Sequence, residues 1–232
     1  LIQDVLQPMR ALYLRMPAVA TLVLAVGAGY LIGGVRSALV VAALTLFIAL
    51  SPWWDRALVT LYMATFGVVI SCLIGFTVGT LCFQNKKSAA FMLGVCDIFQ
   101  TFPSFVYLIP VMMLFGITDT SVLIAVIVYA TIPATRYTIE GLRSVPVGLH
   151  EAATMSGVNK FQRLTKIEFP LAFPHMMLGL NQTIVFALFM VIIGAFIGTE
   201  DLGQYILKAL SDKNGAGIGL TLGICVAFIG LI

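Results

Sequence analysis

The side chains of this sequence that could do chemistry lie mostly inside apolar stretches. Gln100, Thr101 and Ser104 fall within a little more than one helical turn, so a helix would present them on one polar face. Asp97 is the acid that shares this stretch. Such groups donate and accept hydrogen bonds, so the chemistry they predict is contact with a polar solute.

A second polar set lies further along the chain, at Asn181 and Gln182, with His175 on the same helical face as Gln182. Polar groups deep in a membrane usually face a bundle interior or a water-filled cavity, although many only join helices by hydrogen bonds. Both interpretations stay open for the candidate path residues, which are Asp97, Gln100, Thr101, Pro103, Ser104, Asn181 and Gln182.

Other kinds of site are not indicated. The four cysteines have no metal-ligand spacing, and a role in packing is the better interpretation. The sequence has no G-x-x-x-x-G-K-[ST] loop, so we expect this chain not to bind ATP itself. We predict no catalytic residues, no metal site and no cofactor in this chain.

Composition determines the class of protein. Hydrophobic residues make up 60% of the 232 positions and charged residues only 10%, against roughly 25% charged in soluble domains. A membrane helix needs roughly 20 apolar residues. Apolar runs recur at about 17–33, 37–50, 57–83, 91–116, 120–137, 172–198 and from 217 onward. The sequence therefore predicts an all-α polytopic membrane protein with about seven transmembrane helices.

Some of these segments are weaker than others. The run at 37–50 would reach only about 21 Å as a helix, short of a bilayer core about 30 Å thick. Pro103 and Pro110 are expected to break or kink the fourth segment. We divide the chain into an N-terminal arm with peripheral helices (1–56) and a core (57–232). Because it opens on Leu1 and stops inside an apolar run, we expect a piece of a longer protein.

The stretch 144–170 is polar and helical in pattern. Pro146 suits the first turn of a short helix, and Gly157 suits the position just past its end. Asn159 followed by Gln162 predicts the start of a second short helix.

That second helix has an apolar side and a basic side. The apolar side carries Phe161, Leu164 and Ile167, and the basic side carries Lys160, Arg163 and Lys166. We expect it to lie along a membrane surface or against a partner, with Pro170 and Pro174 marking entry into the next span. The alternative is an ordinary connecting loop.

The distribution of basic residues predicts the orientation. Arg136, Arg143 and the basic side of the second short helix place the stretch 144–168 in the cytoplasm. Counting spans puts Lys86 and Lys87 in the cytoplasm as well, and residues 199–216 outside.

The spacing of the 144–170 stretch resembles a known motif. Glu151-Ala152-Ala153, Gly157, Ile167 and Pro170 are placed as in the cytoplasmic coupling loop of ABC-importer permeases, with Phe169 where that family usually has Leu. Residues 97–110 and 197–204 are similar to permeases for glycine betaine, proline betaine and choline, although Thr199-Glu200-Asp201 is more acidic than expected. The resemblance runs from about residue 57 to the end.

This resemblance implies a type I ABC importer permease fold and a set of partners. Those are cytoplasmic ATPases that bind ATP and Mg, an extracytoplasmic substrate-binding protein, and a second permease copy, most simply a homodimer. It implies a non-catalytic subunit of a bacterial or archaeal inner membrane that moves a small zwitterionic or quaternary-ammonium osmolyte by alternating access. It assigns ATPase coupling to Glu151, Ala152, Ala153, Gly157, Ile167 and Pro170.

Two other classes remain open. An ion-coupled secondary transporter should show inverted internal repeats and buried carboxylates, and of these the sequence offers only Asp97. A membrane scaffold or receptor subunit would not need polar positions within its helices.

Overall fold

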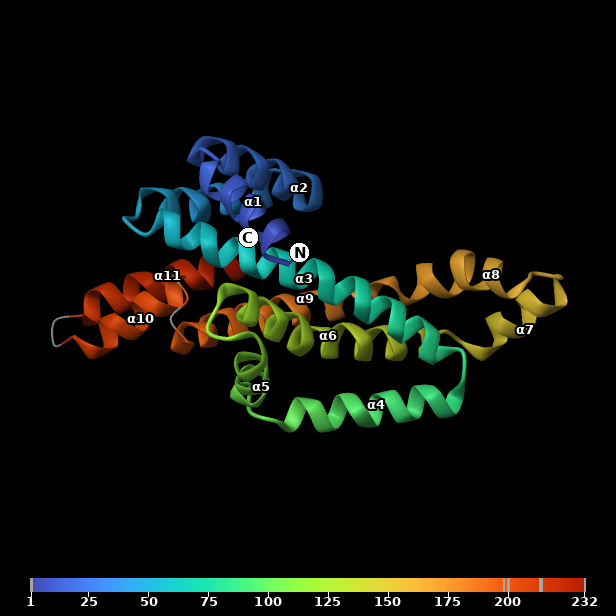
Figure 1. Cartoon of the computed structure of the whole chain (residues 1–232). Coiled ribbons are helices and arrows are strands. Elements are labelled where there is room, and N and C mark those ends of the chain that lie inside the picture. Colours follow the sequence, from blue (N-terminus) through green and yellow to red (C-terminus); the bar gives the residue numbers. More distant parts are fainter. Residues whose placement is uncertain (1, 198, 200, 213–214, 232) are drawn as a thin grey trace. The chain divides into compact units, whose positions relative to one another are not determined.

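The computed structural model describes residues 2–197, 199, 201–212 and 215–231. In those ranges the regular structure is helical, in the order α1 (Ile2–Arg15), α2 (Ala18–Leu50), α3 (Trp54–Phe83), α4 (Lys86–Thr101), α5 (Phe105–Phe115), α6 (Asp119–Arg143), α7 (Val147–Met155), α8 (Lys160–Arg163), α9 (Phe169–Gly194), α10 (Leu202–Ser211) and α11 (Ala216–Leu231) (Figure 1). A π-helical turn (Leu164–Glu168) joins α8 to α9, and a 3-10 turn (Ala195–Ile197) follows α9. The predicted all-α architecture is confirmed.

The chain forms two compact units. Unit 1 comprises Leu1–Phe66, Leu108–Val126 and Leu188–Ile232, and unit 2 comprises Gly67–Tyr107 and Ile127–Ala187. Helices α3, α5, α6 and α9 each contribute residues to both units. The predicted division at residue 56 stays a prediction.

The number of candidate membrane spans is smaller than predicted. Four helical segments of the described chain are long and apolar enough to cross a bilayer, namely α2, α3, α6 and the continuous segment Lys160–Gly194. Helices α4 and α5 make a fifth if the bent pair counts as one span. The number of about seven stays a prediction, since two of the predicted spans fall within α2 and α11 has only 16 residues.

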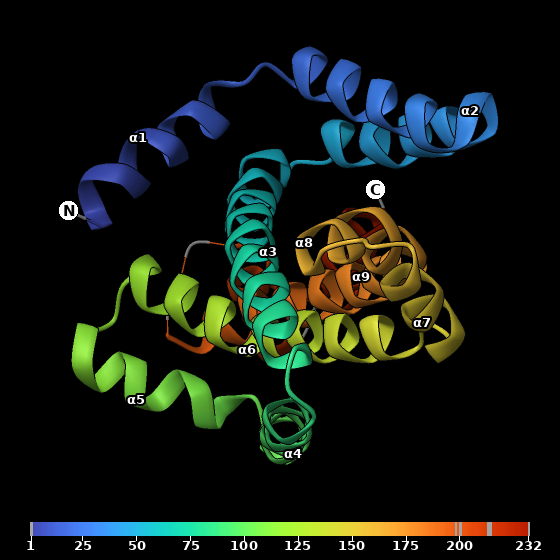
Figure 2. The same ribbon diagram turned by 90° about the vertical axis from the view of Figure 1, so that its right-hand side faces the viewer.

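Helix α2 is a hairpin of two helical arms. Gly34 has φ +68° and ψ −159°, so the helix is interrupted there. A Cβ atom on Gly29 would lie 3.1 Å from Cγ2 of Val41. These residues would stand about 18 Å apart along a straight helix, so the second arm runs back along the first (Figure 2). The predicted separation of this region into two segments is confirmed, but each arm is only about 24 Å long.

The fourth predicted segment is broken at Pro103. Phe102, which precedes this proline, has the extended conformation that the residue before a proline prefers, and it ends α4. The axes of α4 and α5 are bent by 90° across the break. Pro110 lies inside α5 without ending it, so only one of the two predicted breaks occurs.

Unit 2 is held together by close helix contacts. A Cβ atom on Gly75 would lie 2.4 Å from Cβ of Ala134, and one on Gly79 would lie 2.6 Å from Cβ of Thr138. These close approaches bring α3 against α6 in this unit. The hydroxyl group of Ser71 donates to the Ile127 carbonyl at 3.0 Å, which adds a polar link between the same helices.

Unit 1 contains α10 and α11, which lie side by side (Figure 1). The backbone N–H of Leu202 donates to the hydroxyl oxygen of Thr60 at 3.1 Å, so the start of α10 is fixed to α3. Helix α1 is fixed in the same unit by an ion pair of 2.7 Å between Arg10 and Asp119.

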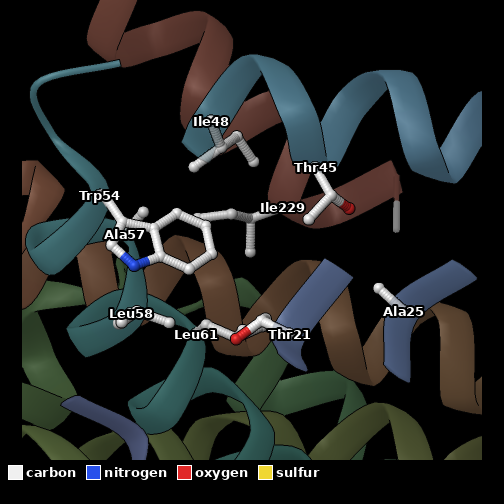
Figure 3. A pocket seen from close by; sticks show the side chains of 9 residues that line it. All are labelled: Thr21, Ala25, Thr45, Ile48, Trp54, Ala57, Leu58, Leu61 and Ile229. Atoms are coloured by element: carbon white, nitrogen blue, oxygen red, sulfur yellow. The ribbon is translucent and has the colours of Figure 1, made fainter. Parts of the chain in front are cut away.

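A small cavity of about 50 Å³ lies within unit 1. Figure 3 shows its side chains converging from both arms of α2, the start of α3, and α11; they are Thr21, Ala25, Thr45, Ile48, Trp54, Ala57, Leu58, Leu61 and Ile229. The hydroxyl groups of Thr21 and Thr45 are both buried, and neither has a hydrogen-bond partner in the part of the chain that is described. Burying these two hydroxyl groups without a hydrogen bond therefore lowers the stability of the fold.

Candidate functional site

The chain reverses direction just after α7. The Ser156 N–H donates to the Ala152 carbonyl at 3.0 Å, and the Val158 N–H donates to the Ala153 carbonyl at 3.1 Å. The second bond spans the six-residue loop of a Schellman motif, with Gly157 at φ +72° between them. No atom lies within 4 Å of a Cβ placed on Gly157, so the backbone conformation alone favours glycine here.

Helix α8 begins with a reciprocal cap. The Gln162 N–H donates to Oδ1 of Asn159 at 2.8 Å, and the Asn159 N–H donates to Oε1 of Gln162 at 3.1 Å. This is the capping box that the sequence predicts. The end of α7 and the start of α8 are thus determined by local hydrogen bonds on either side of Gly157.

Helix α8 does not stand apart from the following span, and the prediction of a separate second helix is wrong. The π-helical turn carries α8 directly into α9, and Pro174 lies inside α9. In that turn the Phe169 N–H donates to the Leu164 carbonyl, five residues back. Because a proline has no N–H, Pro170 and Pro174 fit a segment whose regular bonding is already interrupted.

A buried ion pair closes the π-helical turn. Nε of Arg163 lies 2.9 Å from Oε1 of Glu168, whose side chain is buried. Beside this pair is a hollow of about 430 Å³, lined by Phe83, Gln84, Lys160, Phe161, Arg163, Leu164 and Glu168. The hollow opens between the end of α3 and α8, so both helices contribute to this surface.

The predicted coupling residues differ in exposure. Glu151, Ala152, Gly157 and Pro170 are exposed, Ile167 is half-buried and Ala153 is buried. Large apolar side chains accompany them at the surface, with Met155 91% exposed and Phe161 73% exposed. This surface therefore combines a fixed backbone shape with apolar side chains that nothing in the described chain covers.

The second candidate region is the polar face of α4. Asp97 and Thr101 are exposed, whereas Gln100 is half-buried. The Thr101 hydroxyl group donates to the Ile98 carbonyl of its own helix at 2.7 Å. Past the end of α4, Pro103 is exposed and Ser104 is half-buried. Asp97, Gln100 and Thr101 lie on α4, but the predicted face that also includes Ser104 is not formed on one helix, because α4 ends at Thr101 and the chain bends at Pro103.

Arg136 joins the polar face of α4 to α6 through contacts that were not predicted from the sequence. Its Nη1 atom contacts Oδ1 of Asp97 and lies 3.1 Å from Oε1 of Gln100. Its Nε atom lies 3.0 Å from Oε1 of Glu140, four residues further along α6. The i, i+4 spacing of Arg136 and Glu140 is the sequence signal that could have indicated a charged group inside a span.

Asn181 and Gln182 lie on α9, exposed and half-buried respectively. Within the described residues, neither side chain makes a hydrogen bond or an ion pair. The structure thus brings Asp97 and Gln100 together through Arg136, but it does not join Asn181 or Gln182 to that group. The roles predicted for these residues stay predictions.

Tyr107 packs within an aromatic group of unit 2. Its ring is 5.0 Å from that of Tyr129, which in turn stacks on Phe186 at 4.8 Å. The Tyr107 hydroxyl group donates to the Phe99 carbonyl. Because Tyr107 is buried, a packing role is favoured over an open π face for a cation.

The loop before α10 holds a buried carboxyl group. Oδ1 of Asp201 accepts the Gln204 N–H at 3.0 Å, and Oδ2 accepts the Thr199 hydroxyl at 3.2 Å. Burial raises the pKa of Asp201 to about 7, although these two hydrogen bonds act in the opposite direction. Glu200, Lys213 and Asn214 of the predicted external loop (199–216) lie outside the described residues.

Neither a metal site nor a disulfide is found in the described ranges. No group of three or more His, Cys, Asp or Glu side chains there could hold a metal ion. All four cysteines are free thiols, and three of them are buried.

Comparison with known proteins decides the family. A family model described as "Binding-protein-dependent transport system inner membrane component" matches residues 67–232. The chain belongs to this family. Its members are non-catalytic components of the inner membrane, as the resemblance of the 144–170 stretch predicted.

Curated relatives of the family share long stretches with this chain. The trimethylamine N-oxide transport system permease protein TmoV of Pelagibacter ubique is 90% identical over all of this chain and 32% of its own length. TmoV of Ruegeria pomeroyi is 46% identical over 98% of this chain and 34% of its own. The glycine betaine/proline betaine permease ProW of Escherichia coli is 31% identical over 98% and 64%. The chain thus spans about a third of the first two relatives.

Two solved structures have a similar fold. An inward-facing MetNI methionine ABC transporter chain matches with a TM-score of 0.64 and 22% identity, over 76% of this chain and 88% of its own. A chain of an amino acid ABC transporter solved with histidines matches with a TM-score of 0.58 and 18% identity, over 76% and 90%. The predicted ABC-importer permease fold is therefore confirmed.

Proposed function

We propose that this chain is the membrane-spanning part of an ATP-driven importer for a small zwitterionic or quaternary-ammonium osmolyte. Family membership supports the transport role, and the names of the relatives support the solute class. These relatives are named for the transport of trimethylamine N-oxide, glycine betaine and proline betaine. Each of these molecules carries a methylated nitrogen with a positive charge and an oxygen with a negative charge.

The exposed surface of α7 and α8 carries this proposal. Met155 is almost fully exposed and Phe161 is largely exposed, although both are large and apolar, and Gly157 fixes the turn between them. Exposed apolar surface of this kind is typical of an interaction site. We assign it to a cytoplasmic ATPase, which supplies the ATP and Mg site that this chain is not expected to have. Glu151, Ala152, Ala153, Gly157, Ile167 and Pro170 are the proposed coupling residues.

The proposed path for the solute is the polar face of α4 together with Asn181 and Gln182 of α9. An exposed carboxylate such as that of Asp97 is costly against lipid, so water or a second permease copy is expected to cover this face. A homodimer meets this need with one gene product. An extracytoplasmic binding protein would then deliver the solute, and alternating access would follow from rocking of helices around the path.

The proposed topology keeps seven crossings. It counts the two arms of α2 separately, takes α4 with α5 as one crossing, and includes α11. The stretch 144–168 and Lys86 then lie in the cytoplasm, where basic residues concentrate, and 199–216 lies outside.

The experiment compares Gly157→Val with Gly148→Val in proteoliposomes that contain the full chain, its ATPase and its loaded binding protein. Gly157 needs a positive φ, which costs an L residue about 1–2 kcal/mol, and more for a β-branched one. Gly148, in α7, is the matched control, because it has open space and no positive φ. We expect Gly157→Val, like Glu151→Lys, to abolish uptake or its coupling to ATP hydrolysis, and Gly148→Val to retain both.

Other outcomes would overturn the proposal. Wild-type coupling in both Gly157→Val and Glu151→Lys would make the stretch a mere connector. Uptake driven by an ion gradient without ATPase would indicate a secondary transporter. No uptake by the assembled wild-type complex, with any of the named osmolytes, would favour a scaffold or receptor subunit.

A further inference from the structure

Arg136 is the centre of an ionic network between α4 and α6 in unit 2. It contacts Asp97 and Gln100 through Nη1 and Glu140 through Nε. The side chains are 30% exposed at Arg136, 60% at Asp97 and 39% at Glu140. The two carboxylates and the guanidinium group sum to a net charge of −1, so the network is not neutral.

The network lies between two helices of candidate membrane spans, which distinguishes it from an ordinary surface ion pair. Arg143 donates to the Lys86 carbonyl at 3.2 Å and so joins the end of α6 to the start of α4. Arg136 lies seven residues earlier on α6, about 10 Å further along the helix. Both helices belong to candidate spans, and ionisable groups inside spans usually mark a solute or ion pathway.

One donor group of Arg136 is unused. A guanidinium group has five N–H donors, and the recorded contacts involve only Nε and Nη1. Among the residues that the structure describes, Nη2 has no partner. The side chain is also held in place by three neighbours, so Nη2 is presented in a fixed orientation, which is what recognition of an anionic oxygen requires.

Asp97 offers the opposite charge beside it. Only Oδ1 of this carboxylate contacts Arg136, and the side chain is the most exposed of the network. A methylated ammonium group has no N–H to donate, so it can be stabilised only by a nearby negative charge or a π face. The network thus presents a free donor for an anionic oxygen and an exposed carboxylate for an ammonium group.

We propose that Arg136 and Asp97 form a solute-binding pair in the path, with Nη2 of Arg136 on the anionic oxygen and Asp97 beside the methylated ammonium group. Gln100 and Glu140 hold the guanidinium group in position. The inference rests on the proposed importer function and adds to it the residues that recognise the two charges of the solute. The proposal extends the predicted solute path to α6, where the sequence analysis used Arg136 only as a basic residue that indicates the cytoplasmic side.

The opposing interpretation is that the ion pair only joins two helices. A charge exchange separates the two accounts. The exchange combines Asp97→Arg and Arg136→Asp with Glu140→Gln, so that the acid moved to α6 does not face a second carboxylate. The ion pair can then form again, but the donor and the carboxylate have changed places. A structural pair should be rescued by this exchange, whereas a solute site whose other walls are unchanged should not.

The test uses proteoliposomes with the full chain, its ATPase and its binding protein loaded with glycine betaine or trimethylamine N-oxide. Two quantities are measured, namely ATP hydrolysis stimulated by the loaded binding protein and solute taken up per ATP hydrolysed. We expect Arg136→Gln to keep stimulated hydrolysis within about twofold and to lower uptake per ATP at least tenfold. Arg136→Lys should fall between, because lysine keeps the charge but loses the fixed fork.

Arg143→Gln is the matched control, since it removes an arginine from the same helix outside the network. It is expected to leave uptake per ATP unchanged. The proposal is overturned if Arg136→Gln keeps the wild-type ratio, if uptake and hydrolysis fall in parallel, or if the charge exchange restores transport. A wild-type complex without stimulated hydrolysis or uptake would instead refute the importer function itself.

Discussion

Asp201 gives a prediction in which the sign of a pH effect follows from burial. Its carboxyl group is fully buried and caps α10 through the Gln204 N–H. Burial raises its pKa from 3.8 to about 7. A raised pKa means that the folded protein holds the proton more tightly than the unfolded chain. The contribution of protonated Asp201 to the free energy of unfolding is therefore fully present below about pH 4, and it is lost as the pH rises towards 7.

The size of this effect follows from the shift. A difference of roughly three pKa units at about 1.4 kcal/mol each gives up to about 4 kcal/mol between the two ends of the window. Asp201→Asn removes the titration but keeps an amide oxygen for the Gln204 N–H and a group that can bond to Thr199. The variant should therefore be more stable than the wild type above pH 7 and similar to it or less stable near pH 4.

The assay is thermal unfolding of the purified protein in detergent between pH 4 and 8, followed by near-UV circular dichroism. The wild-type midpoint should decrease across this range relative to that of Asp201→Asn. Hydrogen exchange at the Gln204 amide provides a local measurement, because this N–H is held by the carboxyl group. Parallel pH profiles for the two proteins would refute the reasoning, since the buried carboxyl would then not titrate in this window.

Two further predictions concern the cavity of unit 1 and the topology. Thr45→Val should stabilise the protein by about 1 kcal/mol, because it removes a buried hydroxyl group that has no hydrogen-bond partner among the described residues. Thr60→Val should instead cost about 1–3 kcal/mol, because the Leu202 N–H loses its acceptor. Denaturation midpoints measure both effects, and a loss of stability in Thr45→Val would indicate a water molecule bound in the cavity. In intact cells, an impermeant thiol reagent should label a cysteine placed at Ser211 and spare one at Ser156, and the reverse pattern would invert the proposed orientation.

The coupling stretch was predictable because its chemistry is local. Gly157 ends α7 in a conformation that other residues avoid, and Asn159 with Gln162 starts α8, so a few neighbouring residues determine each boundary. The continuation of α8 into α9 was not predictable in the same way. Pro170 and Pro174 suggested a boundary, but the helix continues through both, and Pro170 follows two residues after a π-helical turn whose bonding already departs from the regular pattern.

The role of Arg136 was missed for a different reason. Counting basic residues assigns a charge to the nearest end of a span, and Arg136 precedes Arg143 by only two turns. Its partners Asp97 and Gln100 come from α4, and their approach depends on how α4 and α6 are aligned side by side. The spacing of residues within either helix does not predict how the two helices are aligned. The hairpin of α2 was likewise visible only as two apolar runs, because the interruption rests on the backbone angles of Gly34 alone.

The π-helical turn has a consequence for coupling, if α8 contacts the ATPase as proposed. Asn181 lies 18 residues beyond Arg163, about 27 Å along the helix, so a movement of α8 reaches it only if the segment between them resists bending. That segment is weakened by Pro170 and Pro174, neither of which can donate a backbone hydrogen bond. The buried Glu168 pairs with Arg163 across this same turn. The ion pair adds a side-chain link between α8 and the end of the π-helical turn, just before the first of these prolines.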